Sequence, residues 1–268
     1  MFSLSTNASI NNDGLLLKSA GNGVSSIQTH FRNAGTVEVR MGTLEFYGSY
    51  ALTHIQTEGQ TILNGGNIDV TSPGVYQLLG GDLLGTGRVT GTVLNSGGTV
   101  KPGLSAGLLN IAGAYTQAAG GSLEIELGGS TPGIDFDQLS IAGVASLGGT
   151  LRVGFIGGFS PTIGEQFIVL TAGNRTGTFA TVEPLTPGPP IDVTYGPNSV
   201  TLQVSGPSPD LNRDGVIDLV DFALFQSCFG GPGEAPPSGC GAGVNADLDV
   251  DGDVDHDDYG LWFVALPR

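Results

Sequence analysis

The chain has 268 residues, of which 46 are glycine, 13% are charged and 39% are hydrophobic, and its formal net charge is −16. Glycine at this level disfavours long helices, because each one costs about 1 kcal/mol relative to alanine inside a helix. No cluster of basic residues accompanies the negative charge, which argues against nucleic acid and anionic membranes as partners.

Membrane insertion is not expected either, since no apolar stretch is long enough for a transmembrane helix. The N-terminal residues 1–7 have neither the basic region nor the apolar core of a signal peptide. Because the pattern that follows begins in mid-repeat, we expect the sequence to be a fragment of a longer chain or to start at an internal methionine.

Residues 1–130 are predicted to form short strands separated by glycine. In segments such as 36–39, 43–46 and 122–127, apolar and polar residues alternate, which is typical of strands with one buried face. Recurrent units of this kind predict stacked repeats that bury a continuous core together. We therefore expect a mainly β chain that folds as a right-handed parallel β-helix, or solenoid. An antiparallel β-sandwich built from hairpins is the alternative.

Residues 131–205 are predicted to form the terminal coils of the solenoid and a β cap. The pattern from 99 to 205, which opens with a Lys-Pro-Gly turn and closes with a hairpin around 196–198, resembles the final coils and cap of autotransporter-type passenger repeats. The resemblance implies an elongated solenoid displayed on a surface. Residues 206–209, with the sequence Gly-Pro-Ser-Pro, are predicted to be a short, stiff linker.

Residues 210–268 hold a 12-residue pattern twice, starting at Asp210 and again 37 residues later at Asp247. Oxygen-bearing side chains occupy positions 1, 3, 5, 9 and 12, and glycine occupies position 6, as in an EF-hand calcium loop. Ca²⁺ prefers about six to eight oxygen ligands, and position 7 usually adds a backbone carbonyl. The sequence predicts that two Ca²⁺ ions are bound by Asp210, Asn212, Asp214, Val216, Asp218, Asp221, Asp247, Asp249, Asp251, Asp253, Asp255 and Asp258.

Two features set these loops apart from an ordinary EF-hand. Position 12 is aspartate in both copies, and the prolines at 207 and 209 exclude a helix before the first loop. Short apolar helices are predicted after the loops instead, over 222–229 and 259–266. This arrangement resembles the type I dockerin domain, over residues 207–268. The resemblance implies an all-α module that is ordered by two Ca²⁺ ions and binds a cohesin domain on another protein.

In that family, cohesin recognition is centred on loop positions 10 and 11. The matching residues here are Leu219 and Val220 in the first copy and His256 and Asp257 in the second. Because the two pairs differ in character, a symmetric, two-way binding mode is not expected.

The only two cysteines, Cys228 and Cys240, flank the glycine- and proline-rich spacer between the helix of the first copy and the second loop. A disulfide between them would suit an extracellular protein. Two unpaired thiols are the alternative.

No catalytic residue is predicted, although parallel β-helices often carry polysaccharide lyases and hydrolases. Hydrolysis of a glycoside needs two carboxyl groups about 5–9.5 Å apart across a cleft. Glu124 and Glu126 share one face of a strand, and Asp135 and Asp137 follow closely. Their alternation with leucine and isoleucine indicates the solvated face of a strand rather than a cleft.

The sequence therefore favours a secreted or cell-surface structural or adhesive protein with a Ca²⁺-dependent docking module and a cohesin-like partner. The alternative is the non-catalytic C-terminal part of an extracellular polysaccharide-degrading enzyme whose catalytic domain lies upstream. Binding of a polysaccharide by the β region itself would need an exposed aromatic platform, for which Tyr47, Tyr50 and Tyr76 are few.

Overall fold

The computed structural model describes residues 9–47, 54–70, 74–186, 188–241 and 244–266. The chain divides into two compact units. The strand unit comprises residues 1–160, 166–188 and 193–202, and the C-terminal module comprises 161–165, 189–192 and 203–268.

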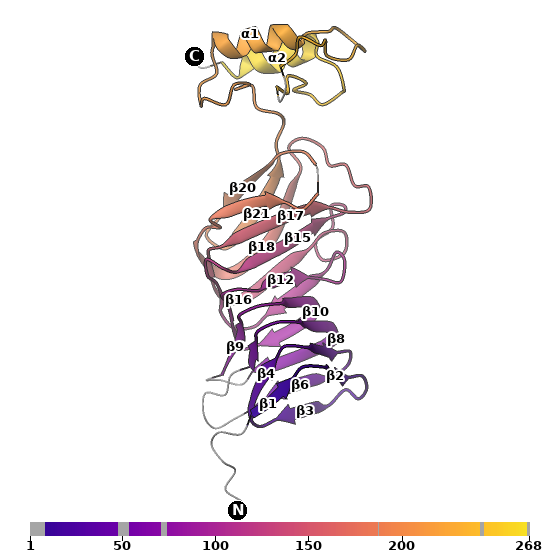
Figure 1. Cartoon of the computed structure of the whole chain (residues 1–268), viewed down its shortest axis with the longest axis vertical. Coiled ribbons are helices and arrows are strands. Elements are labelled where there is room, and N and C mark those ends of the chain that lie inside the picture. The colour runs from indigo at the N-terminus through magenta and orange to yellow at the C-terminus, as the bar shows by residue number, and fades with distance from the viewer. Residues whose placement is uncertain (1–8, 48–53, 71–73, 187, 242–243, 267–268) are drawn as a thin grey trace, which may run out of the picture. The chain divides into compact units, whose positions relative to one another are not determined.

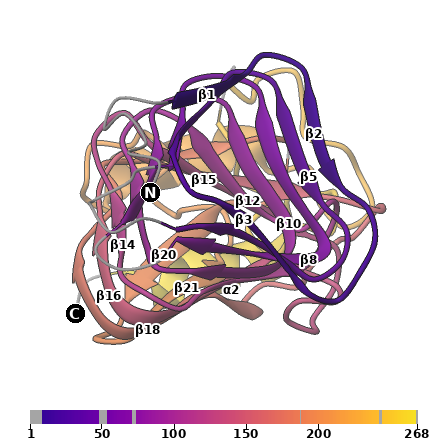
Figure 2. The same cartoon turned by 90° about the horizontal axis from the view of Figure 1, so that it is seen from below.

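The strands form three parallel ladders, in which one turn of the chain contributes a strand to each ladder (Figures 1 and 2). Ladder 1 contains β1 (Ser9–Asn12), β4 (His30–Asn33), β7 (His54–Gln56), β9 (Val75–Leu78), β11 (Thr92–Asn95) and β14 (Tyr115–Gln117). Ladder 2 contains β2 (Leu15–Lys18), β5 (Thr36–Val39), β12 (Thr99–Pro102), β15 (Ser122–Leu127), β17 (Thr150–Phe155) and β19 (Thr181–Pro184). Ladder 3 contains β3 (Val24–Ile27), β6 (Thr43–Phe46) and β13 (Leu108–Ile111). β21 (Ser199–Val204) runs antiparallel to residues 164–175, because the Ala172 N–H donates to the Asn198 carbonyl and the Gly164 N–H donates to the Val204 carbonyl.

Four longer strands turn a corner and take part in two ladders. β8 (Gln60–Val70) and β10 (Asp82–Thr90) serve ladders 2 and 3, and β16 (Gln138–Leu147) and β18 (Gln166–Gly177) serve ladders 3 and 1. β20 (Ile191–Tyr195) precedes β21 across a turn in which the Gly196 N–H donates to the Ser199 carbonyl. Ladder 2 continues from β15 to β17 across residue 130, where the sequence suggested the start of the terminal coils.

The prediction of a mainly β chain with parallel strands is confirmed, and the pairing is consistent with a β-solenoid. Apolar residues at alternate positions produce this core, because neighbouring side chains on a strand point to opposite faces. In ladder 3 the parallel register then aligns inward residues of successive turns into one column. That column runs through Leu44, Ile68, Val89, Ile111 and Ile141, all of them buried.

A second column, at the end of the ladder 1 strands, is mainly polar although it is buried. The register aligns Asn12, Asn33, Gln56, Leu78, Asn95 and Gln117. The Gln117 amide donates to the carbonyl oxygens of Gly148 (2.8 Å) and Thr150 (2.9 Å), and the Gln56 amide donates to Asp82 (2.9 Å). These amides satisfy backbone oxygens that would otherwise be buried without a donor at the corner between turns.

The glycines that separate the strands permit close stacking of these corners. Gly81 has φ +70°, and a Cβ added there would lie 2.1 Å from the carbonyl oxygen of Gly59 on the preceding turn. A larger residue would therefore be strained and would also force the turns apart.

The C-terminal module contains two helices, α1 (Leu219–Cys228) and α2 (His256–Val264). A disulfide joins Cys228, at the end of α1, to Cys240 in the spacer. The core of the C-terminal module consists of Leu211, Phe225, Cys228, Ala246, Leu248, Val254 and Trp262. Both helices begin three residues earlier than the predicted ranges, inside the loops themselves, because loop position 9 provides an N-cap in each copy.

Candidate metal centre

The last four positions of each loop form the first turn of a helix. In the first copy Asp218 is the N-cap of α1, and its side chain accepts the Val220 N–H, while Asp221 completes a capping box. In the second copy Asp255 and Asp258 play the same parts for α2. The carboxylates at positions 9 and 12 thus accept hydrogen bonds from backbone N–H groups at the helix start, which have no partner within the helix.

The carboxylate at position 12 also ties the start of the loop to its end. Asp221 is fully buried and accepts backbone N–H groups from Leu211 at 2.7 Å, Asn212 at 3.0 Å and Asp218 at 2.9 Å. Burial acts to raise the pKa of Asp221, but the backbone donors together outweigh it, and the pKa lies below its ordinary value. Asp221 is therefore held as a carboxylate, the form that binds a cation.

The carboxylate at position 1 folds the front of the loop. Asp210 accepts the N–H of Asp214 at 3.1 Å and that of Gly215 at 2.9 Å. Gly215 has φ +89°, so position 6 needs a residue without a side chain, and Arg213 at position 4 is also left-handed with φ +60°. The side chains at positions 1, 3 and 5 thus all accept backbone N–H groups of one tight turn.

The second loop repeats these bonds 37 residues later. Asp247 accepts the N–H groups of Asp251 and Gly252, both at 3.1 Å. Asp258 accepts those of Leu248, Asp249 and Asp255. Val250 and Gly252 have left-handed φ values of 65° and 102°, like their counterparts in the first loop. Two different stretches of sequence therefore adopt one hydrogen-bonded loop.

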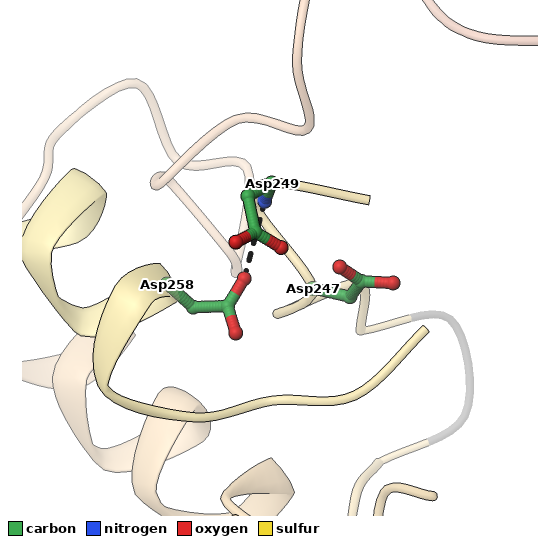
Figure 3. A group of neighbouring side chains, drawn as sticks. All are labelled: Asp247, Asp249 and Asp258. Carbon is green, nitrogen blue, oxygen red and sulfur yellow. Dashed lines mark hydrogen bonds between the residues drawn. The ribbon is translucent and has the colours of Figure 1, made fainter. Parts of the chain in front are cut away.

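The sequence-predicted ligands converge most closely in the second loop. Asp247, Asp249 and Asp258 each offer a carboxylate oxygen, and these oxygens lie within 4.8 Å of one another (Figure 3). Burial and the charges of Asp258 and Asp251 raise the pKa of Asp249, the mark of carboxylates that repel one another. An all-oxygen donor set of this kind fits a hard cation such as Ca²⁺.

Asp253, at position 7, contributes a further buried carboxylate. One of its oxygens accepts the N–H of Gly233 in the spacer, whereas Oδ1 is buried with no hydrogen-bond partner among the described residues. Asp253, Asp255 and Asp258 also place carboxylate oxygens within 4.8 Å of one another. A buried anionic oxygen without a donor is unfavourable, and a bound cation would compensate it.

The first loop is less acidic. Position 3 is Asn212, whose amide donates to Asp214 at 2.9 Å, and position 7 is Val216, which is 54% exposed and can offer only its backbone carbonyl. Both loops have the same shape, but the second has more negative charge to hold a metal ion.

The residues expected to contact a partner lie at the surface where the helices start. Leu219 is 78% exposed and Val220 is 54% exposed, and His256 and Asp257 are also exposed. The ring of His256 meets Phe229 edge-on at 5.4 Å.

Asp137 and Glu124, two of the strand-unit carboxylates weighed for hydrolysis, each have a partner within the described residues. Asp137 is buried and accepts the N–H groups of Gly107 and Glu126, both at 2.9 Å, so it fastens a turn. Burial raises the pKa of Asp137 to about 8, although those two donors act to lower it. Glu124 lies 3.7 Å from Lys101 in an ion pair on the outer face. The structural role of Asp137 was not apparent from the sequence, because its partners are 11 and 30 residues away.

Of the tyrosines that the sequence offers for glycan binding, only Tyr47 is exposed among the described residues. Tyr76 is fully buried, Tyr47 is half exposed, and Tyr50 lies outside the described residues. None of the helices in the described part of the chain combines the length and hydrophobicity needed to span a bilayer.

Comparison with known proteins assigns no function to this site. No protein-family model matches the chain, and no curated protein matches its sequence.

Proposed function

We propose that this protein is a secreted or surface-displayed β-solenoid whose C-terminal module binds two Ca²⁺ ions and docks onto another protein, as type I dockerins do. We further propose a right-handed solenoid, closed by a β cap of the autotransporter-passenger type. The observation that carries the proposal is the recurrence of one set of carboxylate-to-amide bonds in two loops 37 residues apart.

In this proposal the metal and the helices are ordered together. The aspartates at positions 9 and 12 are both metal ligands and helix caps, so an ion that fixes them also fixes the first turns of α1 and α2. Metal binding and folding would then be one coupled event. The exposed positions 10 and 11, which start the helices, would be presented to a cohesin-like partner.

The disulfide between Cys228 and Cys240 supports an extracellular location, since such bonds persist in oxidising compartments. The closed, hydrogen-bonded role of Asp137 supports a structural strand unit rather than a catalytic one.

Calorimetric titration of Ca²⁺ into the full, metal-stripped chain tests the proposal. The chain has one tryptophan, Trp262, which is buried beside Phe222 at 4.8 Å between ring centroids, so its fluorescence reports on the module alone. We expect two bound ions and a change in that fluorescence, with a gain of helical circular dichroism. Absence of binding at millimolar Ca²⁺ would refute the docking-module proposal.

A further inference from the structure

A pocket of about 420 Å³ opens on the C-terminal module, lined from both helices. Its lining residues are Phe222, Phe225, Gln226, Phe229, His256 and Tyr259. No motif in the sequence marks it, because its rings come from two segments separated by the spacer.

Aromatic rings make up most of the pocket lining. Phe225 is 1% exposed and Phe229 is 37% exposed, and their ring centroids lie 6.0 Å apart. Tyr259 from α2 lies 6.3 Å from Phe225 and 6.0 Å from Phe222. The pocket therefore presents several ring surfaces to one occupant.

The mouth of the pocket is polar. Gln226 and His256 are both exposed there, and each offers polar atoms to a ligand that keeps part of its hydration. Asp257, also exposed, follows His256 directly.

The charge around the pocket selects the kind of occupant. Residues 203–268 contain 12 acidic residues, two arginines and no lysine, a net charge of −10. Two bound Ca²⁺ ions would still leave residues 203–268 at −6. An anionic ligand would be repelled, and a neutral apolar one would gain only burial. A cation gains both the acidic field and the negative faces of the rings.

We propose that this pocket receives a lysine or arginine side chain from a basic segment of a partner protein. The inference rests on the proposed function in one respect, because the helices that carry the rings are capped by the calcium-loop aspartates. It adds the chemistry of the partner, which the loop positions alone do not specify.

Binding of two fluorescein-labelled peptides to the full chain tests the proposal. The first is Gly-Ser-Lys-Leu-Lys-Ser-Gly, and the second carries norleucine in place of both lysines. Anisotropy is measured at about 0.15 M salt, where long-range attraction to surface charge is largely screened, in Ca²⁺ and separately in EDTA. We expect the lysine peptide to bind at least about tenfold more tightly than its neutral counterpart.

Matched variants locate the binding. Phe229→Leu should weaken lysine-peptide binding by about 3- to 30-fold, whereas Phe263→Leu should change it less than about twofold. Phe263 is 59% exposed on the same module and lies outside the pocket lining, which makes it the control position. Both substitutions leave the charge of the module unchanged. Gln226→Lys should weaken binding and Gln226→Glu should strengthen it, and this exposed position should not disturb folding.

Calcium binding is followed separately in every variant through Trp262. Lysine-selective binding that depends on Phe229 supports the inference. If this binding persists in EDTA, the result counts only against the proposal that docking depends on Ca²⁺. Equal or tighter binding of the norleucine peptide would overturn the inference. Normal Ca²⁺ binding in the same experiment would leave the proposed function standing. Equal effects of the two phenylalanine variants, or no peptide binding in either buffer, would overturn it as well.

Discussion

The His54→Phe substitution is expected to remove an acid sensitivity of the strand unit. His54 on β7 is fully buried, and its ring is stacked on Tyr76 at 4.2 Å and on Phe31 at 5.3 Å. Neither ring nitrogen has a hydrogen-bond partner among the described residues. Burial lowers the pKa of His54 to about 3.

The sign and size of the effect follow from the two pKa values. Between the unfolded value of about 6.5 and the folded value of about 3, the unfolded chain binds a proton at this site and the folded chain does not. Stability is therefore fully present above about pH 6.5 and is lost as the pH falls. The loss is about 1.4 kcal/mol for each pH unit and reaches roughly 4–5 kcal/mol near pH 3.

At neutral pH two opposing effects accompany the substitution. Removal of two buried nitrogens without partners should stabilise the fold by about 1–3 kcal/mol. The larger ring should cost a similar amount in a packed core. The difference in pH dependence, rather than the neutral-pH stability, is thus the diagnostic quantity.

Urea unfolding of the wild type and the variant, followed by far-UV circular dichroism between pH 7 and pH 4, measures this difference. The stability gap should change in favour of the variant by roughly 3 kcal/mol over that range. Tyr76→Phe is the control, because it removes the 2.8 Å bond from the Tyr76 hydroxyl to Gln56 without changing titration below pH 7. Parallel pH profiles for wild type and His54→Phe would refute the reasoning.

Three further predictions concern the loops and the corners. Asp258→Ala should destabilise the metal-free module by about 3–5 kcal/mol, because three backbone N–H groups lose a charged acceptor. Urea unfolding followed by tryptophan fluorescence measures this loss, and the control Asp257→Ala, at an exposed position, should lower stability by no more than about 0.5 kcal/mol. Asp253→Asn should weaken Ca²⁺ binding several-fold yet raise metal-free stability by about 1 kcal/mol, since it removes the charge of a buried carboxylate in which Oδ1 has no donor. Calorimetry and urea unfolding that both match wild type would contradict this. Gly81→Ala should lower stability by at least about 3 kcal/mol and Gly157→Ala by about 1–2 kcal/mol. Both glycines have positive φ, but only at Gly81 would the added Cβ clash with a carbonyl oxygen. Equal melting temperatures of the two variants would count against the stacking argument.

The strands and their parallel stacking could be predicted from local patterns. The alternation in Thr36–Val39 places Val37 and Val39 inside, and the structure buries both completely. Glycine between such segments indicated short strands joined by tight turns. These signals lie within a few residues of one another, so a single sequence displays them.

The polar column inside ladder 1 could not be predicted, because its members have no constant spacing. Asn33 follows Asn12 by 21 residues, Gln56 follows Asn33 by 23, and Asn95 follows Leu78 by only 17. Loops of variable length hide the register, and side chains such as His54 then look like surface residues. Only the stacking of turns shows that they face inward.

The two acidic loops are a different case, since the hydrogen bonds within each loop span fewer than 12 residues and the spacing of the predicted ligands is visible directly. The sequence did not reveal where the helices begin, because the loop pattern predicts Asp218 and Asp255 as ligands and does not mark them as helix caps. The aromatic pocket was also missed as a cavity, since Phe229 and His256 meet only across the folded module.

The proposed double role of Asp218 and Asp255, as helix caps and metal ligands, also bears on how these positions can change during evolution. Serine, threonine or asparagine would cap a helix about as well as aspartate does. Any of them, however, would remove a negative charge from the loop. If the loops bind Ca²⁺, substitutions that a helix alone would tolerate should be rejected at Asp218 and Asp255. Related sequences should therefore keep aspartate there even where the helices themselves have drifted.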